Sequence, residues 1–208
     1  MKREEKNQQT RRRIMDSALA EFSKKGYGAS SVNTICSAEN ISKGIIYHYF
    51  STKDDLFLAC VEECFTLLTE YLKKEACSAG KGAEEQLEGY FGARMDFFRE
   101  YPVYQRIFCE AVVAPPEHLR SEIQKRRQEF DLLNIQLLEQ VLEPVSLRPQ
   151  VTKAEVIEMF RRFQDFINAD RRIMDFSGRE FELHEESCRK AVDILLYGAV
   201  DRQESGGE

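Results

Sequence analysis

Residues 31–50, SVNTICSAENISKGIIYHYF, hold two short helical patterns on either side of the segment Asn40-Ile41-Ser42. Asn40 tolerates the left-handed backbone of a tight turn, Ile41 can fill the angle between the helices, and Ser42 can cap the second helix. We therefore expect helices at 31–39 and 43–50 that cross steeply, as in a helix-turn-helix. Their shared core should consist of the apolar residues on the inner faces: Val32, Ile35, Ala38, Ile41, Ile45, Ile46 and Phe50.

Helical periodicity continues on both sides of this segment, and no stretch combines β-branched residues with the strict alternation of a strand. Gly26 should end a first helix at 7–25, and glycines and prolines separate the later helices. After residue 51 the expected helices cover 52–77, 83–100, 102–113, 117–142, 152–169 and 183–200. Residues 170–182 could continue a helix or form a loop. The expected fold class is all-α, with a three-helix head and a body of about six helices.

The charge of the chain is divided between these two parts. Residues 1–53 contain 10 Lys or Arg and 5 Asp or Glu, a difference of +5, whereas residues 54–208 contain 20 and 31, a difference of −11. A basic head on an acidic body is expected when only the head meets a polyanion. We therefore predict a DNA-binding domain at 1–53 and a second domain, for dimerisation and effector binding, at 54–208.

Three segments of the head resemble the TetR family of bacterial regulators, named for the tetracycline repressor. They are Gly26-Tyr27 with Ser30-Ser31-Val32, the pair Thr34-Ile35, and residues 42–56, SKGIIYHYFSTKDDL. Asn40 departs from the Gly that the family most often has, but Asn also accepts a positive φ; Cys36 departs from the usual Ala. The resemblance covers about the first quarter of the chain, and it implies a dimeric regulator that binds double-stranded DNA.

In a head of this kind the second short helix enters the major groove of DNA with its N-terminal turn leading. Gly44 lets the backbone come close, and Lys43 can reach a phosphate or a guanine edge. Asn33 can pair with adenine, and Lys53 should hold a phosphate beside the free amides of the next helix. Arg11, Arg12 and Arg13 should add phosphate contacts without specificity. The expected DNA-binding residues are Asn33, Lys43, Gly44, Tyr47, His48 and Lys53.

The body should hold the homodimer interface, because specificity requires two heads about one helical turn of DNA apart. The family resemblance implies that the last two helices of each chain, at 153–169 and 183–200, form this interface. Its expected residues are apolar or small and repeat at helical spacing: Val156, Met159, Phe160, Phe163, Ala191, Ile194, Leu195 and Gly198.

Seven aromatic residues lie between Tyr90 and Phe108, and the family keeps its effector cavity between helices of this region. A hydrophobic or aromatic effector is therefore expected, although a ring at helical spacing more often belongs to the core. The expected effector-binding residues are Phe91, Met95, Phe98, Tyr104 and Phe108.

We expect no catalytic, metal or cofactor site. The six cysteines form no CxxC pair, and His184-Glu185 begins like a zinc-protease HExxH motif but continues to Cys188. No phosphate loop or nucleophile elbow is present in the sequence. Residues 1–13 lack the apolar core of a secretory signal, and no run is long enough to span a bilayer, so a cytoplasmic protein without a membrane partner is expected.

The leading interpretation is a repressor of a palindromic operator that a small hydrophobic or aromatic effector releases. An activator, or a ligand-independent regulator, would share the same head. The rival from another class is a helical protein-interaction module with a vestigial head. Alanine at Lys43, Tyr47 and Lys53 separates these classes, because only a DNA-binding protein requires those side chains.

Overall fold

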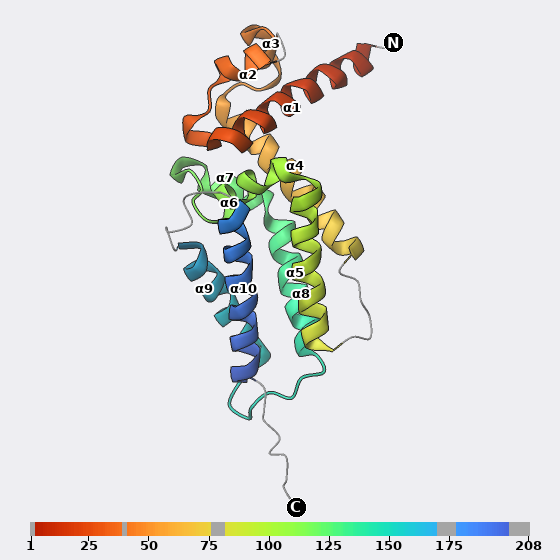
Figure 1. Cartoon of the computed structure of the whole chain (residues 1–208), viewed down its shortest axis with the longest axis vertical. Helices are drawn as coiled ribbons and strands as arrows, with labels where there is room; N and C mark the ends of the chain where they lie inside the picture. The colour runs from red at the N-terminus through yellow and green to blue at the C-terminus, as the bar shows by residue number, and fades with distance from the viewer. Residues whose placement is uncertain (1–2, 39–40, 76–81, 170–177, 200–208) are drawn as a thin grey trace, which may run out of the picture. The chain divides into compact units, whose positions relative to one another are not determined.

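The computed structural model describes residues 3–38, 41–75, 82–169 and 178–199. Within these ranges the chain forms ten α-helices, two short 3₁₀ helices and no β-strand (Figure 1). The expected all-α class is therefore confirmed. The helices are α1 (Arg3–Ala29), α2 (Val32–Ala38), α3 (Lys43–Tyr49), α4 (Lys53–Glu75), α5 (Ala83–Glu100), η1 (Pro102–Tyr104), α6 (Gln105–Val112), η2 (Glu117–Leu119), α7 (Arg120–Arg126), α8 (Gln128–Leu142), α9 (Lys153–Ala169) and α10 (Gly178–Ala199).

The chain divides into two compact units, and each unit is made of two segments that are separate in sequence. Unit 1 contains Met1–Glu70 and Asp96–Phe130, and unit 2 contains Tyr71–Met95 and Asp131–Glu208. Compactness is a different property from function, so the functional boundary between residues 53 and 54 stays a prediction.

The helix-turn-helix forms in unit 1, where α2 contacts both α1 and α3 (Figure 1). Apolar spacing along α1 buries one side of that helix, and the inner faces of α2 and α3 close over the core. The expected inner residues that are buried, each at most 9% exposed, are Val32, Ile35, Ile41, Ile46 and Phe50. The predicted core of the motif is therefore confirmed at these five positions.

The start of α3 determines which side of this short helix is buried. The Ser42 hydroxyl accepts the Ile45 N–H at 3.3 Å, as expected of an N-cap. Ile46 and Phe50 are four residues apart and lie on the same inner face. The expectation that Ile45 belongs to the core is wrong: Ile45 is 43% exposed, because neighbouring helical residues point about 100° apart. Asn40 and the side chain of Ala38 lie outside the described residues.

The body helices depart from the predicted boundaries in three places. The expected helix at 102–113 is divided into η1 (Pro102–Tyr104) and α6 (Gln105–Val112). Residues 117–142 are not one helix: η2, α7 and α8 follow one another, and Arg127 with φ −92° and ψ 0° separates the last two. Backbone conformation rather than a Pro or Gly ends α7, so the apolar pattern continues across the break. Helix α10 begins at Gly178, five residues earlier than expected, and Phe181 in its first turns is buried. Residues 170–177 lie outside the described part.

Aromatic rings form the centre of unit 1. Phe65 of α4 lies with its ring centroid 5.6 Å from that of Phe108 in α6 and 5.4 Å from that of Phe130 in α8. Phe98 of α5 adds a fourth ring, 5.0 Å from Phe108. Edge-to-face and tilted pairs at these separations are favourable beyond the apolar area that they bury.

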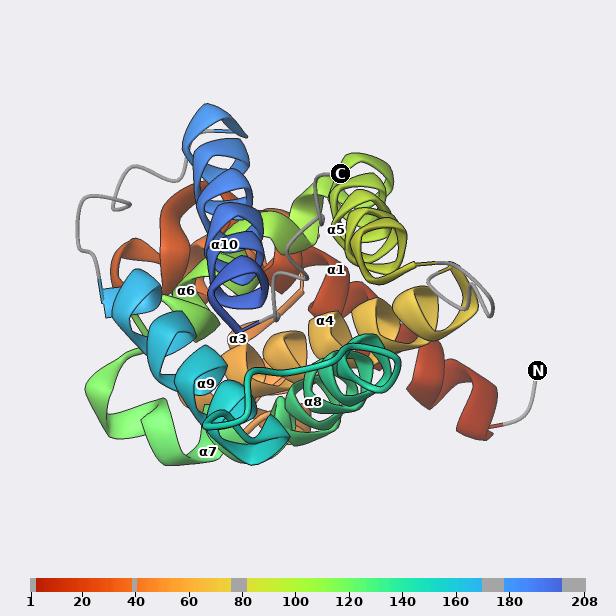
Figure 2. The ribbon, with the colours of Figure 1, turned by 90° about the horizontal axis from the view of Figure 1, so that it is seen from below.

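Unit 2 contains α9 and α10, which lie side by side (Figure 2). Val156 of α9 and Ala191 and Val192 of α10 are buried. On other faces of the same helices, Met159, Leu183 and Ile194 are between 54% and 69% exposed. These two helices therefore keep an apolar surface after they have packed within the unit.

Candidate nucleic-acid interface

The outer face of α3 carries polar and small residues above a buried apolar face. Lys43, Gly44, Tyr47 and His48 are exposed, whereas Ile46 is 1% exposed. The Lys43 ammonium lies 5.9 Å from the centroid of the Tyr47 ring, so the two side chains share one side of the helix. A Cβ built on Gly44 would meet no atom within 4 Å, which leaves this turn open to a close neighbour. This face can donate hydrogen bonds and a positive charge to a polyanion.

Asn33 lies on the exposed face of α2, and its side chain is not part of the core. The backbone N–H of Asn33 donates to the hydroxyl of Ser31 at 3.2 Å, so Ser31 caps the start of α2. The ring of His48 packs edge-on against that of Tyr49 at 5.2 Å. Five of the six predicted DNA-binding residues are thus exposed, and their contacts with DNA stay a prediction.

Lys53, the sixth predicted DNA-binding residue, contacts its own chain. Its ammonium donates to the carbonyl oxygens of Tyr27 at 2.7 Å and Ser30 at 3.1 Å. The ammonium also lies 4.1 Å from the centroid of the Tyr27 ring. Lys53 therefore ties the start of α4 to the segment between α1 and α2, and its contact with DNA stays a prediction.

The arginines of α1 differ in their surroundings. Arg12 pairs with Asp16 at 2.6 Å and with Glu63 of α4 at 2.6 Å, and these carboxylates raise the pKa of its guanidinium. Glu63 also accepts a 2.5 Å hydrogen bond from the hydroxyl of Tyr104. Arg11 lies over the Phe50 ring at 5.3 Å. Among the three arginines that were expected to contact phosphate, Arg12 is already paired with two carboxylates.

A break in α1 at Gly26 brings the head into contact with α6. Gly26 has φ 72°, and the backbone N–H of the following residue, Tyr27, donates to the Glu110 carboxylate at 2.9 Å. Burial raises the pKa of Glu110, and the hydrogen bond from Tyr27 opposes that shift. Arg106, one turn earlier in α6, donates to the Lys24 carbonyl at 3.0 Å. A Cβ at Gly26 would overlap the Glu110 carboxylate.

Three side chains join the same region to the start of α4 and to η2. The Tyr27 hydroxyl donates to Asp54, and His118 lies 3.1 Å from that hydroxyl and 3.3 Å from an Asp54 oxygen. Burial and the Asp54 carboxylate raise the pKa of Tyr27 to about 12. Thr52 and Asp55 cap α4 reciprocally, with hydrogen bonds of 3.0 and 3.1 Å. Sequence reasoning missed the contacts of Tyr27, because their partners are 27 and 91 residues away.

The expected effector-binding residues fall in two different surroundings. Phe98 and Phe108 belong to the aromatic core of unit 1, and Tyr104 in the same unit is buried with its hydroxyl bound to Glu63. Phe91 and Met95 belong to unit 2, where Phe91 is buried and Met95 is partly buried. The five residues do not gather around one centre within either unit, and their role in binding an effector stays a prediction.

Some of the expected dimer residues are already buried by packing within their own chain, and others are exposed. Val156 and Ala191 are each 4% exposed, whereas Met159 is 54% and Ile194 is 69% exposed. Phe160 is partly buried. Phe163, Leu195 and Gly198 lie outside the residues whose side-chain surroundings the structure describes.

No group of three or more His, Cys, Asp or Glu residues in the described ranges could hold a metal ion. No described helix is both long enough and apolar enough to cross a membrane. Cys60 and Cys64 of α4 are fully or nearly fully buried, and burial raises the pKa of both thiols.

Comparison with known proteins finds one family model and several relatives that match part of the chain. The model of the family described as bacterial regulatory proteins, tetR family, matches residues 14–60. Over 120 residues the chain is 26% identical to the biofilm operon icaADBC negative transcriptional regulator IcaR of Staphylococcus epidermidis, and over 123 residues it is 28% identical to the uncharacterized regulator YerO of Bacillus subtilis. These matches cover 57% and 58% of this chain but only 62% and 43% of the relatives, less than two thirds of either.

Solved structures resemble the chain over most of its length. The fatty acid degradation regulator FadR of Bacillus halodurans superposes with a TM-score of 0.67 at 18% identity and covers 91% of this chain and 95% of its own. The FadR of Bacillus subtilis, solved in complex with stearoyl-CoA, gives a TM-score of 0.66 at 17% identity and covers 89% and 97%. At these identities the likeness establishes the fold.

Proposed function

Because the chain belongs to the TetR family of transcriptional regulators, we propose that it is a dimeric repressor that binds a palindromic DNA operator through α3. A small apolar effector releases the repressor from this operator. The repressor role is supported by IcaR of Staphylococcus epidermidis, a negative regulator that is 26% identical to the chain over 120 residues. The observation that carries DNA binding is the orientation of α3, whose buried Ile46 and Phe50 leave Lys43, Tyr47 and His48 facing outward.

The two heads of the dimer are held by α9 and α10. Met159 and Ile194 are two of the exposed apolar side chains on these helices, and a partner copy would cover them. Val156 and Ala191 contribute indirectly, because they fix the packing of α9 on α10 within one chain. A symmetric pair of heads reads two half-sites in successive major grooves.

Effector release follows from a difference in ligand affinity between DNA-bound and free conformations of the dimer. The stearoyl-CoA complex of the Bacillus subtilis FadR is a property of that protein, and it supports the idea that a body of this fold can hold a largely apolar ligand. Lys53 acts as a positioning residue in this proposal, because its ammonium already holds two carbonyl oxygens between α1 and α2.

The test is salt-dependent DNA binding by the full chain, measured by fluorescence anisotropy on genomic fragments that include the region upstream of its own gene. The double variant K43A/Y47A should lose most of the affinity, because it removes a phosphate contact and a base contact from each head. The control K125A removes an equal charge from an exposed residue of α7 that pairs with Glu122, and it should bind as the unmodified chain does.

Two outcomes contradict the proposal. One is that no fragment binds even at low salt. The other is that K125A weakens binding as much as K43A/Y47A, because binding would then reflect charge alone and not the face of α3. If every activity of the chain survives in K43A/Y47A, the protein-interaction module is the better interpretation.

A further inference from the structure

A cluster of buried polar side chains lies in unit 2, apart from the head. Arg94 of α5 pairs with Glu185 of α10, and the two side chains are 5% and 4% exposed. Tyr90, one turn before Arg94, donates its hydroxyl proton to the side-chain oxygen of Asn134 in α8. The cluster thus joins three helices that the sequence separates by up to 91 residues. None of its members was among the predicted effector residues, although Phe91 lies 5.1 Å from the Arg94 guanidinium.

The hydrogen bonds of this cluster leave one charged oxygen without a donor. Arg94 directs both Nε, at 2.6 Å, and Nη2, at 2.5 Å, to the same oxygen of Glu185, Oε2. The third nitrogen, Nη1, lies 3.5 Å from the Tyr90 hydroxyl. The other oxygen of Glu185, Oε1, is buried and has no hydrogen-bond partner among the described residues. A bidentate pair, which Arg and Glu commonly form, would have used both oxygens.

Structural stability does not account for this arrangement. A buried ion pair is on average no more stable than apolar residues of the same size, because both charges lose their hydration. A buried acceptor without a donor is a further cost. Buried polar groups that are left unsatisfied in a folded protein are often groups that function requires. The requirement here is a donor that approaches Glu185 Oε1.

The charges of the cluster define the chemistry of that donor. Arg94 is already neutralised by Glu185 and enclosed by the rings of Tyr90 and Phe91, at 5.4 and 5.1 Å. An anionic ligand would have to displace Glu185 and leave its carboxylate buried and unpaired. A ligand with an N–H donor would satisfy Oε1 without breaking the existing pair, and a charged ammonium makes the stronger bond.

We propose that the Arg94–Glu185 cluster is the polar end of a binding site for an apolar molecule that carries a hydrogen-bond-donating ammonium group, with Glu185 Oε1 as the acceptor. The proposal names the ligand class for the effector of the proposed repressor, and it rests on that function only for the effect of the ligand on DNA binding. Binding itself can be measured without DNA.

The test uses the full chain and three probes that share a phenylethyl group. Phenethylammonium has both charge and N–H donors, its N-trimethyl derivative has charge without donors, and 3-phenylpropionate has the opposite charge. The measurement is the concentration-dependent rise in the melting temperature, followed by circular dichroism. We expect phenethylammonium to bind at least about tenfold more tightly than either of the other two probes, since one charged hydrogen bond is worth roughly that factor.

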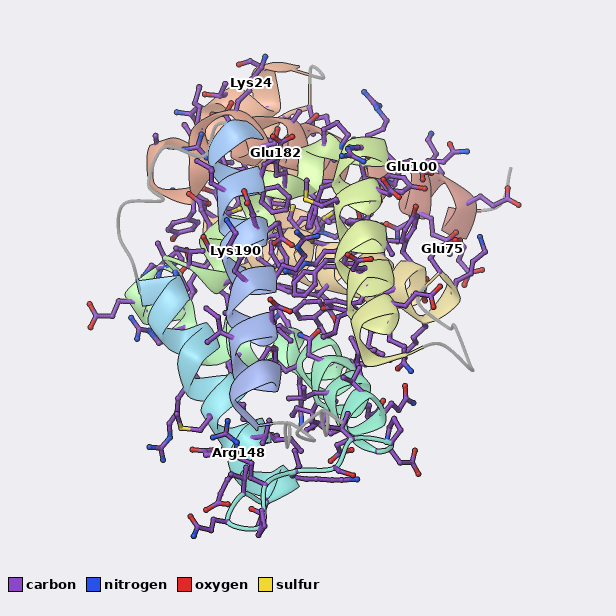
Figure 3. The ribbon with its side chains drawn as sticks, turned by 60° about the horizontal axis from the view of Figure 1, so that its bottom comes forward. Lys24, Glu75, Glu100, Arg148, Glu182 and Lys190 are labelled. Atoms are coloured by element: carbon purple, nitrogen blue, oxygen red, sulfur yellow. The ribbon has the colours of Figure 1, made fainter. Side chains whose placement is uncertain are left out.

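The double variant R94M/E185M removes the pair while keeping the volume apolar, and it should fold and lose the response to phenethylammonium. The matched control is E186Q, which changes the next residue of α10. Glu186 is exposed and pairs at 2.7 Å with Lys190, a residue labelled on α10 in Figure 3. E186Q should respond as the unmodified chain does. If R94M/E185M does not fold, the Arg94 Nε–H resonance of the unmodified chain replaces it as the readout and must shift with phenethylammonium alone.

The proposal is overturned if no probe binds, if the trimethyl derivative or the propionate binds as tightly, or if R94M/E185M keeps the response. A separate anisotropy measurement with DNA distinguishes failure of the ligand site from failure of the proposed repressor function. Binding of phenethylammonium with unchanged DNA affinity would support the site and refute its role as an effector site. If the unmodified chain binds no DNA at all, the repressor function is refuted, while the measured binding of phenethylammonium remains valid.

Discussion

Replacement of Lys53 by methionine separates a structural lysine from a DNA-binding one. The ammonium of Lys53 makes two charged hydrogen bonds, to Tyr27 and Ser30, and lies on the Tyr27 ring. Charged hydrogen bonds contribute about 1.5 kcal/mol each at the low end, and an exposed cation–ring contact about 0.5 kcal/mol. Water can reach this half-buried site and replace part of these contacts, so we expect K53M to lower the free energy of unfolding by about 2 kcal/mol.

For a chain of this size, such a loss corresponds to a fall in the melting temperature of roughly 4–8 °C. Circular dichroism measures it directly, because the chain is helical. The matched control is K43M: Lys43 is exposed on α3, so its loss should leave stability within about 0.5 kcal/mol. The two variants should also differ in DNA binding. K43M should reduce the slope of log affinity against log salt by about 0.9 for each head, while K53M should leave the slope unchanged. An unchanged melting temperature together with a reduced salt slope for K53M would refute the reasoning.

Three further perturbations test other parts of the structure. G26A places a Cβ at φ 72° against the Glu110 carboxylate, so it should lower the free energy of unfolding by at least about 1–2 kcal/mol in a urea titration. The control is G28A, where a Cβ meets nothing within 4 Å; it should be neutral or stabilising. Equal effects of the two variants would contradict the break at Gly26. Burial raises the pKa of Tyr90 from 10.0 to about 12. Between these pH values the folded chain keeps a proton that the unfolded chain releases, so the free energy of unfolding should fall as the pH rises from 10.0 to about 12. Y90F should reduce this loss in alkaline unfolding curves. I194D replaces an apolar side chain that is 69% exposed by a charged one, and it should shift the dimer towards monomer in light scattering. The control D193N changes the neighbouring exposed residue and should leave the dimer intact. An unchanged mass for I194D would place the interface elsewhere.

Local pattern was sufficient for most of the core of the helix-turn-helix and for several helix ends. The spacing of Val32, Ile35, Ile46 and Phe50 predicted the core of the helix-turn-helix, and Ser42 predicted the cap of α3. Helix α5 begins and ends where glycines and Pro102 indicated. These features depend on residues within a few positions of one another, which is the range that periodicity and capping describe.

The contacts that sequence reasoning missed join residues that are far apart in the chain. The sequence does not predict the two intrachain partners of Lys53, because they are backbone carbonyls, which no side-chain pattern marks. Arg94 and Glu185 both lie on helices where a charged residue ordinarily faces water, and nothing local shows that the two meet in the interior. The break at Arg127 has the same origin, because residue type does not encode its bridge-region backbone.

The bonds of Arg12 set a limit on how this regulator can be recombined with its relatives. A chimera that exchanges residues 1–53 for another head would remove the Arg12 guanidinium that Glu63 contacts here and leave Glu63 with the hydroxyl of Tyr104. Glu63 would then keep a carboxylate that is only 21% exposed and has lost its counter-charge. Transplanting the head therefore requires Glu63 of α4, which accepts from Arg12, and Tyr104 of η1, which donates to Glu63, to be transferred with it, so the portable part of the molecule is discontinuous in sequence.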